Sequence, residues 1–387
     1  MKALTYLGTK EIQVDVIDDP RVRAPDDIIV QVTTAAISGS DLQAYRGRVP
    51  GMKPGDVMGR EFVGIVRETG ADVTSLVPGD RVVTPFVIAC GHCRFCERRL
   101  FAACDATNAV RDTHHDNTHV YPGAAEFGLG DLWGGVAGGH AEFVRVPRAN
   151  TGPLKLPDGI DDEQAVLLGE TLPTAYQAVL DAQAGPGTTL AIFGAGPVGL
   201  MAAACARMRQ VAALYMVDDN EDRLRFAADA YGAVPVRFDT GAGAAAKIVA
   251  LTDRYGVDAA IDAVGRDAKG NAAETMLTSL HLEAGSAHAL RQAVAAVRRG
   301  GTLCVAAFYA GLGHGIPLGE IYGKGLTIRT GRAHAQRYLP ELLRFVQDGA
   351  LHPEAVITHR MPLADAIGAY HRLDQKHDAC LKIVLKP

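Results

Sequence analysis

The spacing of apolar and polar residues differs between the two halves of the chain. Up to residue 150, short runs alternate between apolar and polar positions and are separated by Gly, Pro and Asp, as in residues 26–37 and 79–88. This pattern predicts a compact, mainly β domain. From Leu172 onward, helical stretches alternate with six short apolar strands, which predicts a doubly wound parallel sheet. The expected strands are TLAIFG, LYMVDD, VPVRF, DAAIDAVG, GTLCVAAF and LTIRTG.

The spacing of apolar residues changes again towards the C-terminus. Residues 338–349 place apolar side chains at helical spacing, and residues 379–387 form a strand-like run that can return to the first domain. We therefore expect a β-rich domain over residues 1–170, a parallel-sheet domain over residues 171–331, and a return of residues 332–387 to the first domain.

A glycine pattern follows the first strand of the second domain. Gly194, Gly196 and Gly199 form G-x-G-x-x-G directly after a strand and directly before a helix, with Pro197 and Val198 between the last two glycines. The first glycine permits a tight turn, the second lets the backbone approach a pyrophosphate, and the third allows close helix packing. The phosphates then lie at the helix N-terminus. The context predicts a dinucleotide site.

An acidic residue ends the next strand. Asp218 accepts hydrogen bonds from the adenosine ribose hydroxyls in such a site and repels a 2′-phosphate, so NAD is expected rather than NADP. Arg223 is expected either to stack against the adenine or to pair with Asp218.

Four of the seven cysteines are crowded into residues 90–104. Four thiolates at this spacing can close a tetrahedral shell around Zn²⁺ with no open position, which indicates a structural site. An iron–sulfur cluster is the main alternative, but its fourth cysteine would follow after three residues and precede Pro, whereas here it follows after seven and precedes Asp105. The expected zinc ligands are Cys90, Cys93, Cys96 and Cys104.

Composition and charge indicate which classes of partner the chain can bind. The chain has 39 basic and 44 acidic residues, a formal charge of −5, and no dense basic cluster, which argues against nucleic acid as a partner. The N-terminus lacks the apolar core of a signal peptide, and no apolar run is long enough to span a membrane. We expect a cytoplasmic enzyme that acts on a small molecule.

The order of these features resembles the zinc-containing medium-chain alcohol dehydrogenases, and among them the formaldehyde- and threonine-dehydrogenase-like members. The resemblance implies an α/β fold, with a GroES-like β-rich catalytic domain and a Rossmann domain that carries a doubly wound parallel six-stranded sheet. It also implies an active site in the cleft between the domains and a homodimer or homotetramer. The motifs that carry it are Gly39-Ser40-Asp41, Gly59-x-Glu61-x-x-Gly64 with Gly70 and Gly79-Asp80, the four cysteines, Leu172-Pro173-Thr174, and Gly194 to Gly199.

The chain departs from this family where a second, catalytic zinc is bound. The family ligands are a Cys before Gly-Ser-Asp, the His of Gly-His-Glu, and an Asp or Cys shortly before Leu-Pro-Thr. Those positions here are Ser38, Arg60 and Glu170. A neutral serine is a poor zinc ligand, and an arginine offers only donors and stays protonated. We expect one structural zinc per chain and no catalytic zinc.

The three replacements are chemically compatible with one another. Arg60 brings a fixed positive charge near the metal's place, with Glu170 and Glu61 as candidate partners and Ser38 as a further hydrogen-bonding group. Two interpretations stay open. Arg60 either plugs a vacated cavity, or replaces zinc as an electrophile that polarises a carbonyl or binds a substrate anion.

The resemblance also assigns contacts with the cofactor and the substrate. Ser40 is expected to touch the nicotinamide ribose or the substrate oxygen. The histidine that relays the alcohol proton in the nearest relatives is replaced by Gln43, which cannot act as an acid or base near pH 7. Further cofactor contacts are expected at Gly39, Thr174, Val264, Gly331 and Arg332.

The histidines of the segment RDTHHDNTHVYPG lie in a polar stretch. A surface loop is the favoured interpretation, ahead of a pocket contact or a metal site. The roles of His114, His115, His119 and His334 stay open.

Three functions follow from these observations. The favoured one is an NAD-dependent oxidoreductase without catalytic zinc, which transfers hydride to or from a small activated alcohol or carbonyl, an imine or an alkene. The second is a redox-neutral enzyme in which tightly bound NAD serves an epimerisation, elimination or rearrangement. The third is a non-catalytic NAD-binding protein.

Overall fold

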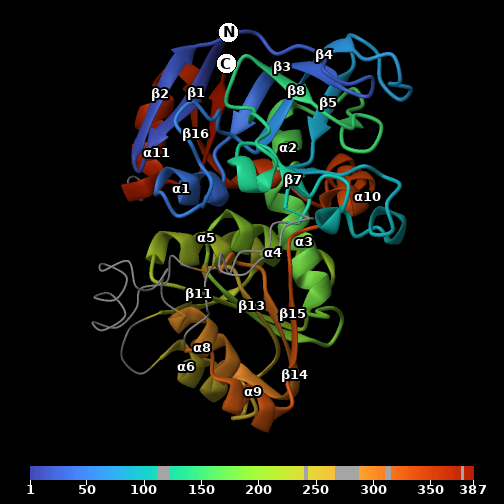
Figure 1. The fold of residues 1–387 in the computed structure, drawn as a ribbon. Coiled ribbons are helices and arrows are strands. Elements are labelled where there is room, and N and C mark those ends of the chain that lie inside the picture. Colours follow the sequence, from blue (N-terminus) through green and yellow to red (C-terminus); the bar gives the residue numbers. More distant parts are fainter. Residues whose placement is uncertain (111–122, 239–242, 266–286, 310–314, 376–378) are drawn as a thin grey trace. The chain divides into compact units, whose positions relative to one another are not determined.

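The computed structural model spans all 387 residues and describes them except for 111–122, 239–242, 266–286, 310–314 and 376–378 (Figure 1). Three of the histidines noted above, His114, His115 and His119, lie outside the described residues. The chain folds as two compact units. The first contains the described parts of residues 1–173 and 333–387, and the second contains those of 174–332.

The first unit is built on a mostly antiparallel sheet with the strand order β16-β17-β3-β4-β5-β9, in which β8 also pairs with β3. Its central strand, β3, buries most of its side chains and pairs with β4 and with β17 from the end of the chain. Residues from both ends of the sequence therefore share one sheet (Figure 1). The strands of this unit are β1 Lys2–Gly8, β2 Glu11–Val16, β3 Ile28–Ala36, β4 Glu61–Thr69, β5 Arg81–Thr84, β6 Val87–Ile88, β7 Ala125–Glu126, β8 Phe143–Val146, β9 Leu154–Lys155, β16 Ile357–Pro362 and β17 Lys382–Lys386.

Capping residues start two of the helices of this unit. Ser38 and Asp41 form a capping box that starts α1, and Asp161 and Gln164 do the same for α2. The helical spacing noted after residue 338 is confirmed by α10, which buries one apolar face. The helices are α1 Gly39–Tyr45, α2 Asp162–Val166, α3 Thr171–Asp181, which continues into the second unit, α10 Ala335–Gln347 and α11 Ala366–Gln375. The short 3-10 turns are Cys96–Arg98, Phe101–Ala103, Asp131–Trp133, Pro353–Val356 and Leu363–Asp365.

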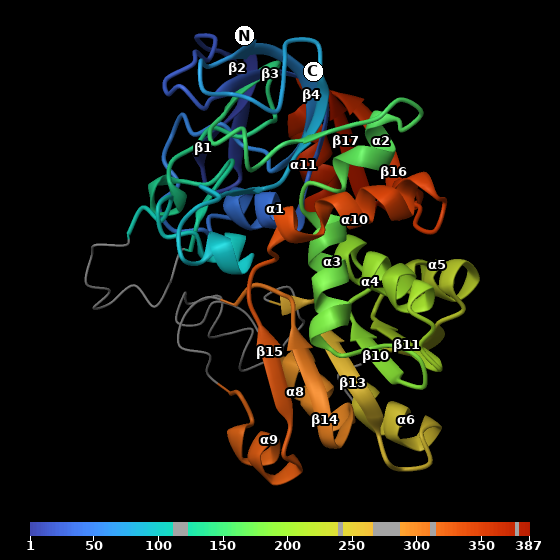
Figure 2. The same ribbon diagram turned by 90° about the vertical axis from the view of Figure 1, so that its right-hand side faces the viewer.

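The second unit contains a six-stranded sheet, entirely parallel, with the order β12-β11-β10-β13-β14-β15 (Figure 2). Its inner strands are almost fully buried, as expected for a parallel sheet covered by helices. The α/β fold class and the doubly wound sheet are confirmed. The elements are β10 Thr189–Phe193, α4 Pro197–Met208, β11 Ala213–Asp218, α5 Glu221–Tyr231, β12 Val234–Arg237, α6 Ala244–Leu251, β13 Val257–Asp262, α8 His288–Ala296, β14 Val297–Val305, α9 Leu318–Lys324 and β15 Thr327–Thr330.

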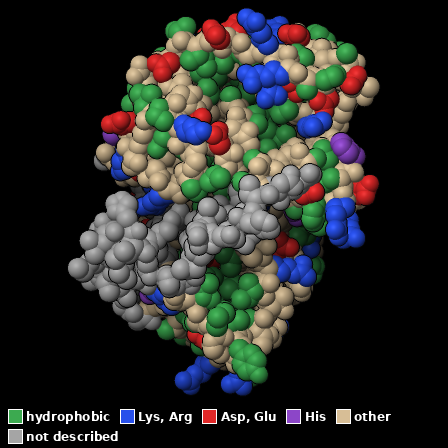
Figure 3. All heavy atoms as spheres, viewed as in Figure 1, with side chains coloured by type: hydrophobic (Ala, Val, Ile, Leu, Met, Phe, Trp, Pro, Cys, Tyr) green, Lys and Arg blue, Asp and Glu red, His purple; other side chains and the backbone are tan. Residues whose placement is uncertain are grey.

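The surface carries mixed charge. On the face drawn in Figure 3, basic and acidic side chains are interspersed. Among the described helices, none has the length and apolar character needed to cross a membrane.

Candidate active site

Arg60 forms a buried cluster of charged side chains with Glu126 and Glu170 in the first unit, and it is only 4% exposed. It follows Gly59, whose φ of +108° favours glycine and whose Cβ, if present, would lie 2.4 Å from the His140 backbone nitrogen. The guanidinium Nη2 lies 2.7 Å from Glu126 Oε2 and 3.2 Å from Glu170 Oε1. Its Cζ lies 4.7 Å from the centroid of the Phe86 ring. One buried guanidinium therefore holds two carboxylates and rests on an aromatic ring.

The backbone of Phe86 brings both carboxylates to Arg60. The Phe86 N–H donates to the carbonyl of Gly169, next to Glu170, at 2.9 Å. The Phe127 N–H, next to Glu126, donates to the Phe86 carbonyl at 3.2 Å. Two segments far apart in the sequence are thereby fixed on either side of the guanidinium.

Glu126 was not identified from the sequence, because it belongs to no recognised motif. The available signal was its position as the lone charged residue in the apolar stretch GAAEFGLG, residues 123–130. A charged residue in such a stretch is rarely buried unless it is paired.

Two expected partners of Arg60 make other contacts. Ser38 is the N-cap of α1: its hydroxyl accepts a hydrogen bond from Asp41 N at 3.2 Å, and its own N–H donates to Asp41 Oδ2 at 2.7 Å. The expectation that Ser38 bonds Arg60 is therefore wrong, since capping uses its hydroxyl. Ser40, two residues on, is brought to the cluster instead, and its hydroxyl donates to Glu170 Oε1 at 3.0 Å.

Glu61 pairs with a lysine rather than with Arg60. It forms a buried ion pair with Lys382 of β17 and accepts a hydrogen bond from Thr171 N at 2.8 Å. Lys382 Nζ also donates to Thr171 Oγ1 at 3.1 Å. This pair ties the start of β4 to the start of α3 and to the last strand. The lysine was missed as well, although a charged residue inside the apolar run ACLKIVLKP was the clue.

Acidic groups outnumber cations in this buried region. Burial raises the pKa of Asp41 to about 6, and the negative charge of Glu170 adds to the effect, while the Ser38 N–H opposes it. The carboxylates of Glu126 and Glu170 face a single guanidinium. The cluster thus has no net positive charge with which to attract an anion.

The raised pKa of Asp41 makes stability depend on pH. Between its ordinary value of 3.8 and about 6, the folded state holds a proton that the unfolded state has released, so the free energy of unfolding falls as pH rises through this window. The full effect corresponds to about 3 kcal/mol. Asp41→Asn keeps an oxygen acceptor for the Ser38 N–H and cannot ionise. We expect it to raise the free energy of unfolding by about 1 kcal/mol more at pH 8 than at pH 5. Urea denaturation at both pH values measures this, and an equal gain at both would contradict it.

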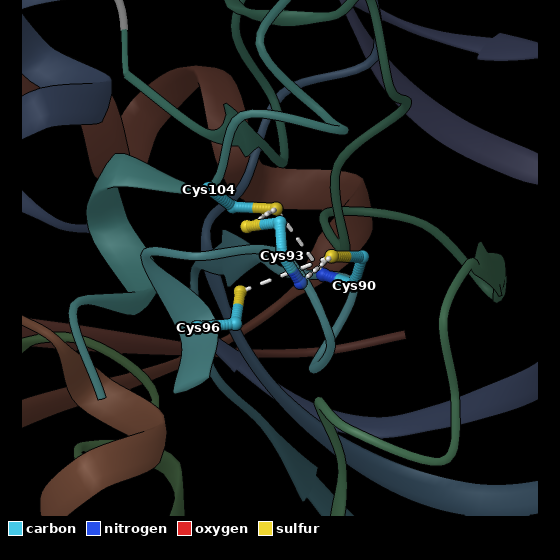
Figure 4. A group of neighbouring side chains, drawn as sticks. All are labelled: Cys90, Cys93, Cys96 and Cys104. Carbon is cyan, nitrogen blue, oxygen red and sulfur yellow. Dashed lines mark hydrogen bonds between the residues drawn. The ribbon is translucent and has the colours of Figure 1, made fainter. Parts of the chain in front are cut away.

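The four cysteines of the predicted metal lobe converge (Figure 4). All four sulfur atoms lie within 4.8 Å of one another, and the Sγ–Sγ distances from Cys90 to Cys96 and from Cys93 to Cys104 are both 3.9 Å. A tetrahedral Zn²⁺ with Zn–S bonds of about 2.3 Å requires sulfur separations of about 3.8 Å. The N–H groups of Cys90 and Cys93 each donate to a neighbouring sulfur at 3.3 Å, as thiolate ligands require. These residues fit a structural zinc.

The positions of a second, catalytic zinc do not fit a metal. Of the three side chains, Arg60 is a buried cation in two ion pairs, Ser38 caps a helix, and only Glu170 is an acidic ligand. Within the described part of the chain, the four cysteines are the one group of three or more potential ligands close enough to share an ion.

The glycine pattern of the second unit has the geometry of a nucleotide cradle. Gly194 has a φ of +101°, and a Cβ there would meet Val264 Cγ2 at 2.9 Å. A Cβ on Gly199 would lie 1.8 Å from the carbonyl oxygen of Gly194, so this helix packs too closely for any other residue. A Cβ on Gly196, at the start of α4, meets nothing within 4 Å. That open space, followed by Pro197 at the first helical turn, fits a pyrophosphate.

Except for Gly39, the remaining predicted cofactor residues lie at the same end of this sheet or on α3. Asp218 ends β11, and its carboxylate accepts hydrogen bonds from Ala195 N at 2.6 Å and Asn220 N at 2.9 Å. It therefore lies directly against the glycine loop. The Arg332 carbonyl accepts a hydrogen bond from Gln177 of α3 at 3.3 Å, which places the segment Gly331–Arg332 beside the helix that carries Thr174. Val198 lies in the first turn of α4, and Arg223 in the first turn of α5.

Two further predicted side chains, Gln43 and His334, have structural contacts, whereas Gly39 is open. Gln43 accepts a hydrogen bond from Arg48 Nη1 at 3.2 Å. Gly39 is exposed at the start of α1, with nothing within 4 Å of a Cβ built there. His334 Nδ1 accepts a hydrogen bond from Ala102 N at 3.1 Å, and burial lowers its pKa. This bond joins the start of α10 to the cysteine lobe and gives His334 a tethering role.

Comparison with known proteins agrees with this geometry. A family model described as the alcohol dehydrogenase GroES-like domain matches residues 24–158. AdhB of Bacillus subtilis, described as an uncharacterized zinc-type alcohol dehydrogenase-like protein, is 37% identical over 389 positions that cover 100% of both chains. The glutathione-independent formaldehyde dehydrogenase of Pseudomonas aeruginosa is 31% identical, with 95% of this chain and 90% of that protein covered.

The solved structures include an alcohol dehydrogenase, TADH from Thermus sp. ATN1, with a TM-score of 0.82 and 32% identity over 100% of this chain and 99% of that one. The similarity extends over both units and confirms the resemblance drawn from the sequence. The chain therefore belongs to the zinc-type medium-chain alcohol dehydrogenase family, and it is an alcohol dehydrogenase-like oxidoreductase that uses a nicotinamide dinucleotide.

Proposed function

We propose that this protein is an NAD(H)-dependent oxidoreductase that works without a catalytic zinc, on a small alcohol or carbonyl, imine or alkene substrate. The observation that supports this most strongly is the buried guanidinium of Arg60, held 2.7 Å from Glu126 and 3.2 Å from Glu170 where the family binds its metal. A cation of fixed charge at that point excludes a second cation. Nicotinamide, when bound, supplies the hydride chemistry.

The substrate of such an enzyme differs from that of a zinc enzyme. Zinc lowers the pKa of a bound alcohol, and no residue of this cluster can replace that Lewis acid fully. The proposed substrates are therefore ones in which hydride transfer is already favourable, such as an acidic hydroxyl or a polarised double bond. In place of a metal, Arg60 supplies the positive charge that holds Glu170, and Glu170 in turn contacts Ser40.

A turnover assay distinguishes the three functions. Reduction of NAD⁺, followed as NADH absorbance with a panel of small alcohols, is expected for the proposed oxidoreductase. NAD that copurifies and survives dialysis, without net NADH formation, would favour a redox-neutral enzyme instead. Loosely bound NAD with no turnover of any substrate would contradict both and leave a binding protein.

The cofactor preference is predicted by Asp218. Its carboxylate at the end of β11, against the glycine loop, accepts hydrogen bonds from ribose hydroxyls and repels a 2′-phosphate. A charge-assisted hydrogen bond contributes about 1.5–3 kcal/mol, so Asp218→Ser is expected to shift the ratio of NADP⁺ to NAD⁺ dissociation constants by about 10–100-fold toward NADP⁺. Calorimetric titration of both cofactors measures this, with Asp219→Ser as the neighbouring control. An unchanged ratio would contradict the assignment.

We also propose that the chain is a cytoplasmic homodimer or homotetramer. The strand GTLCVAAF is β14 and is paired on both sides, so β15 forms one of the two open edges of the sheet. All four residues of β15 are exposed, and an open parallel edge offers unpaired backbone groups to a second copy. Sedimentation equilibrium tests this, and a stable monomer would contradict it.

A further inference from the structure

Ser40 connects the buried acidic cluster to its surroundings. The residue is half-buried and follows Gly39, which is exposed at the start of α1. Its hydroxyl donates to Glu170 Oε1 at 3.0 Å, and Glu170 is only 9% exposed. A hydroxyl in this position can contact a small molecule on one side and the carboxylate on the other.

The two carboxylate oxygens of Glu170 make different contacts. Oε1 interacts with both the Ser40 hydroxyl and the Arg60 guanidinium, at 3.0 and 3.2 Å. Oε2 is buried and has no hydrogen-bond partner among the described residues. A buried carboxylate oxygen without a donor is unfavourable, and the deficit disappears when the oxygen receives a hydrogen bond.

The charges around Glu170 disfavour the binding of an anion. Arg60 also forms an ion pair with Glu126, at 2.7 Å. The charge of Glu126 already balances that of the guanidinium, so an ionised Glu170 adds a negative charge to the cluster. The nearby Asp41 is a fully buried acid that adds to the negative potential. A further anion would therefore be repelled here.

We propose that Glu170 accepts the substrate's hydroxyl proton through Ser40, and that the substrate is an uncharged alcohol rather than a carboxylate or phosphate. This inference rests on the proposed NAD-dependent function. NAD⁺, which the glycine loop and Asp218 would hold, would supply the acceptor for the substrate's hydride. The substrate O–H proton passes to Ser40 Oγ while the proton of Ser40 moves to Glu170 Oε1. The products are a carbonyl compound, NADH and protonated Glu170, and the reverse sequence reduces the carbonyl.

This route takes over the roles of the relay histidine and of the catalytic metal in the family. Gln43 cannot carry a proton, and no metal stabilises an alkoxide, so a base within one hydroxyl of the substrate is needed. Arg60 acts as a positioning residue, because it fixes the same oxygen of Glu170 that faces Ser40.

Glu170→Gln tests the proposal, since glutamine keeps an acceptor oxygen for both Ser40 and Arg60 but cannot take up a proton. We expect kcat/KM for alcohol oxidation to fall by about 10²–10⁴-fold, with the dissociation constant of NADH unchanged within about threefold. Glu126→Gln is the matched control: it removes the same charge from the same guanidinium without touching Ser40, and we expect less than about a tenfold loss.

Ser40 provides a second, independent arm. Ser40→Ala is expected to reduce kcat/KM by at least about 10²-fold, and Ser40→Thr, which restores a hydroxyl, to recover most of it. The pH dependence of kcat in the wild type should be lost in Glu170→Gln and kept in Glu126→Gln.

The possible results separate this proposal from the function on which it rests. Equal losses in Glu170→Gln and Glu126→Gln, or a Ser40→Ala enzyme as active as the wild type, would overturn the relay while leaving the oxidoreductase intact. A wild type that binds NADH yet oxidises no alcohol of the panel would overturn the proposed function itself, and the relay with it.

Discussion

Arg60→Met lowers the free energy of unfolding by about 3–5 kcal/mol at pH 7 in our account, because it leaves two buried carboxylates without their cation. Glu126 and Glu170 are held at 2.7 and 3.2 Å from the guanidinium, and methionine fills a similar volume without a charge. Few single substitutions cost so much, and those that do break buried networks of this kind. Urea denaturation of the wild type and the variant measures the difference.

Two further variants isolate the charge from the shape. Arg60→Lys keeps the charge, but a point ammonium cannot reproduce the planar donors, so a smaller loss is expected. Combining Arg60→Met with Glu126→Gln and Glu170→Gln removes all three charges and should recover much of the lost stability. If Arg60→Met alone is as stable as the wild type, the carboxylates are not held by Arg60 and the assignment fails.

The second large effect concerns the cysteine lobe. Cys96→Ser removes one of four converging thiolates, and a structural zinc contributes roughly 10 kcal/mol or more to the folding of the segment that it holds. We expect the variant to lose its zinc and residues 90–104 to become sensitive to protease. The adjoining apolar cluster, which includes Phe86 and Ala335, should loosen as well. Limited proteolysis and metal analysis detect these changes.

Cys205→Ala is the matched control for this experiment. Cys205 is a buried cysteine on α4, outside the lobe, and its loss should leave the zinc content and the protease pattern of residues 90–104 unchanged. A Cys96→Ser protein that retains a full equivalent of zinc would show that the metal is bound elsewhere.

The features that the sequence predicted well are those set by local pattern. The six apolar strands became the parallel sheet, and the glycines at 194, 196 and 199 were recognisable because they stand between a strand and a helix. The cysteine spacing carried enough information to predict a convergent cluster. In each case the residues that define the feature are close together in the chain.

The candidate site was predicted less completely, because its contacts join distant segments. Lys382 meets Glu61 across 321 residues, and Glu126 reaches Arg60 from a strand of two residues. Ser38 illustrates a different difficulty. Its hydroxyl could accept a hydrogen bond either from an arginine or from the N-terminus of a helix, and in the structure it forms the capping box of α1. Only the tertiary fold decides such competitions.

We propose that Arg60 stands where the family's catalytic zinc would be bound. The most direct measurement is the zinc content of the wild-type protein, purified with zinc supplied in excess and then dialysed. One zinc per chain, absent from Cys96→Ser, is the result that we predict. Two zinc ions per chain, with one remaining in Cys96→Ser, would contradict it.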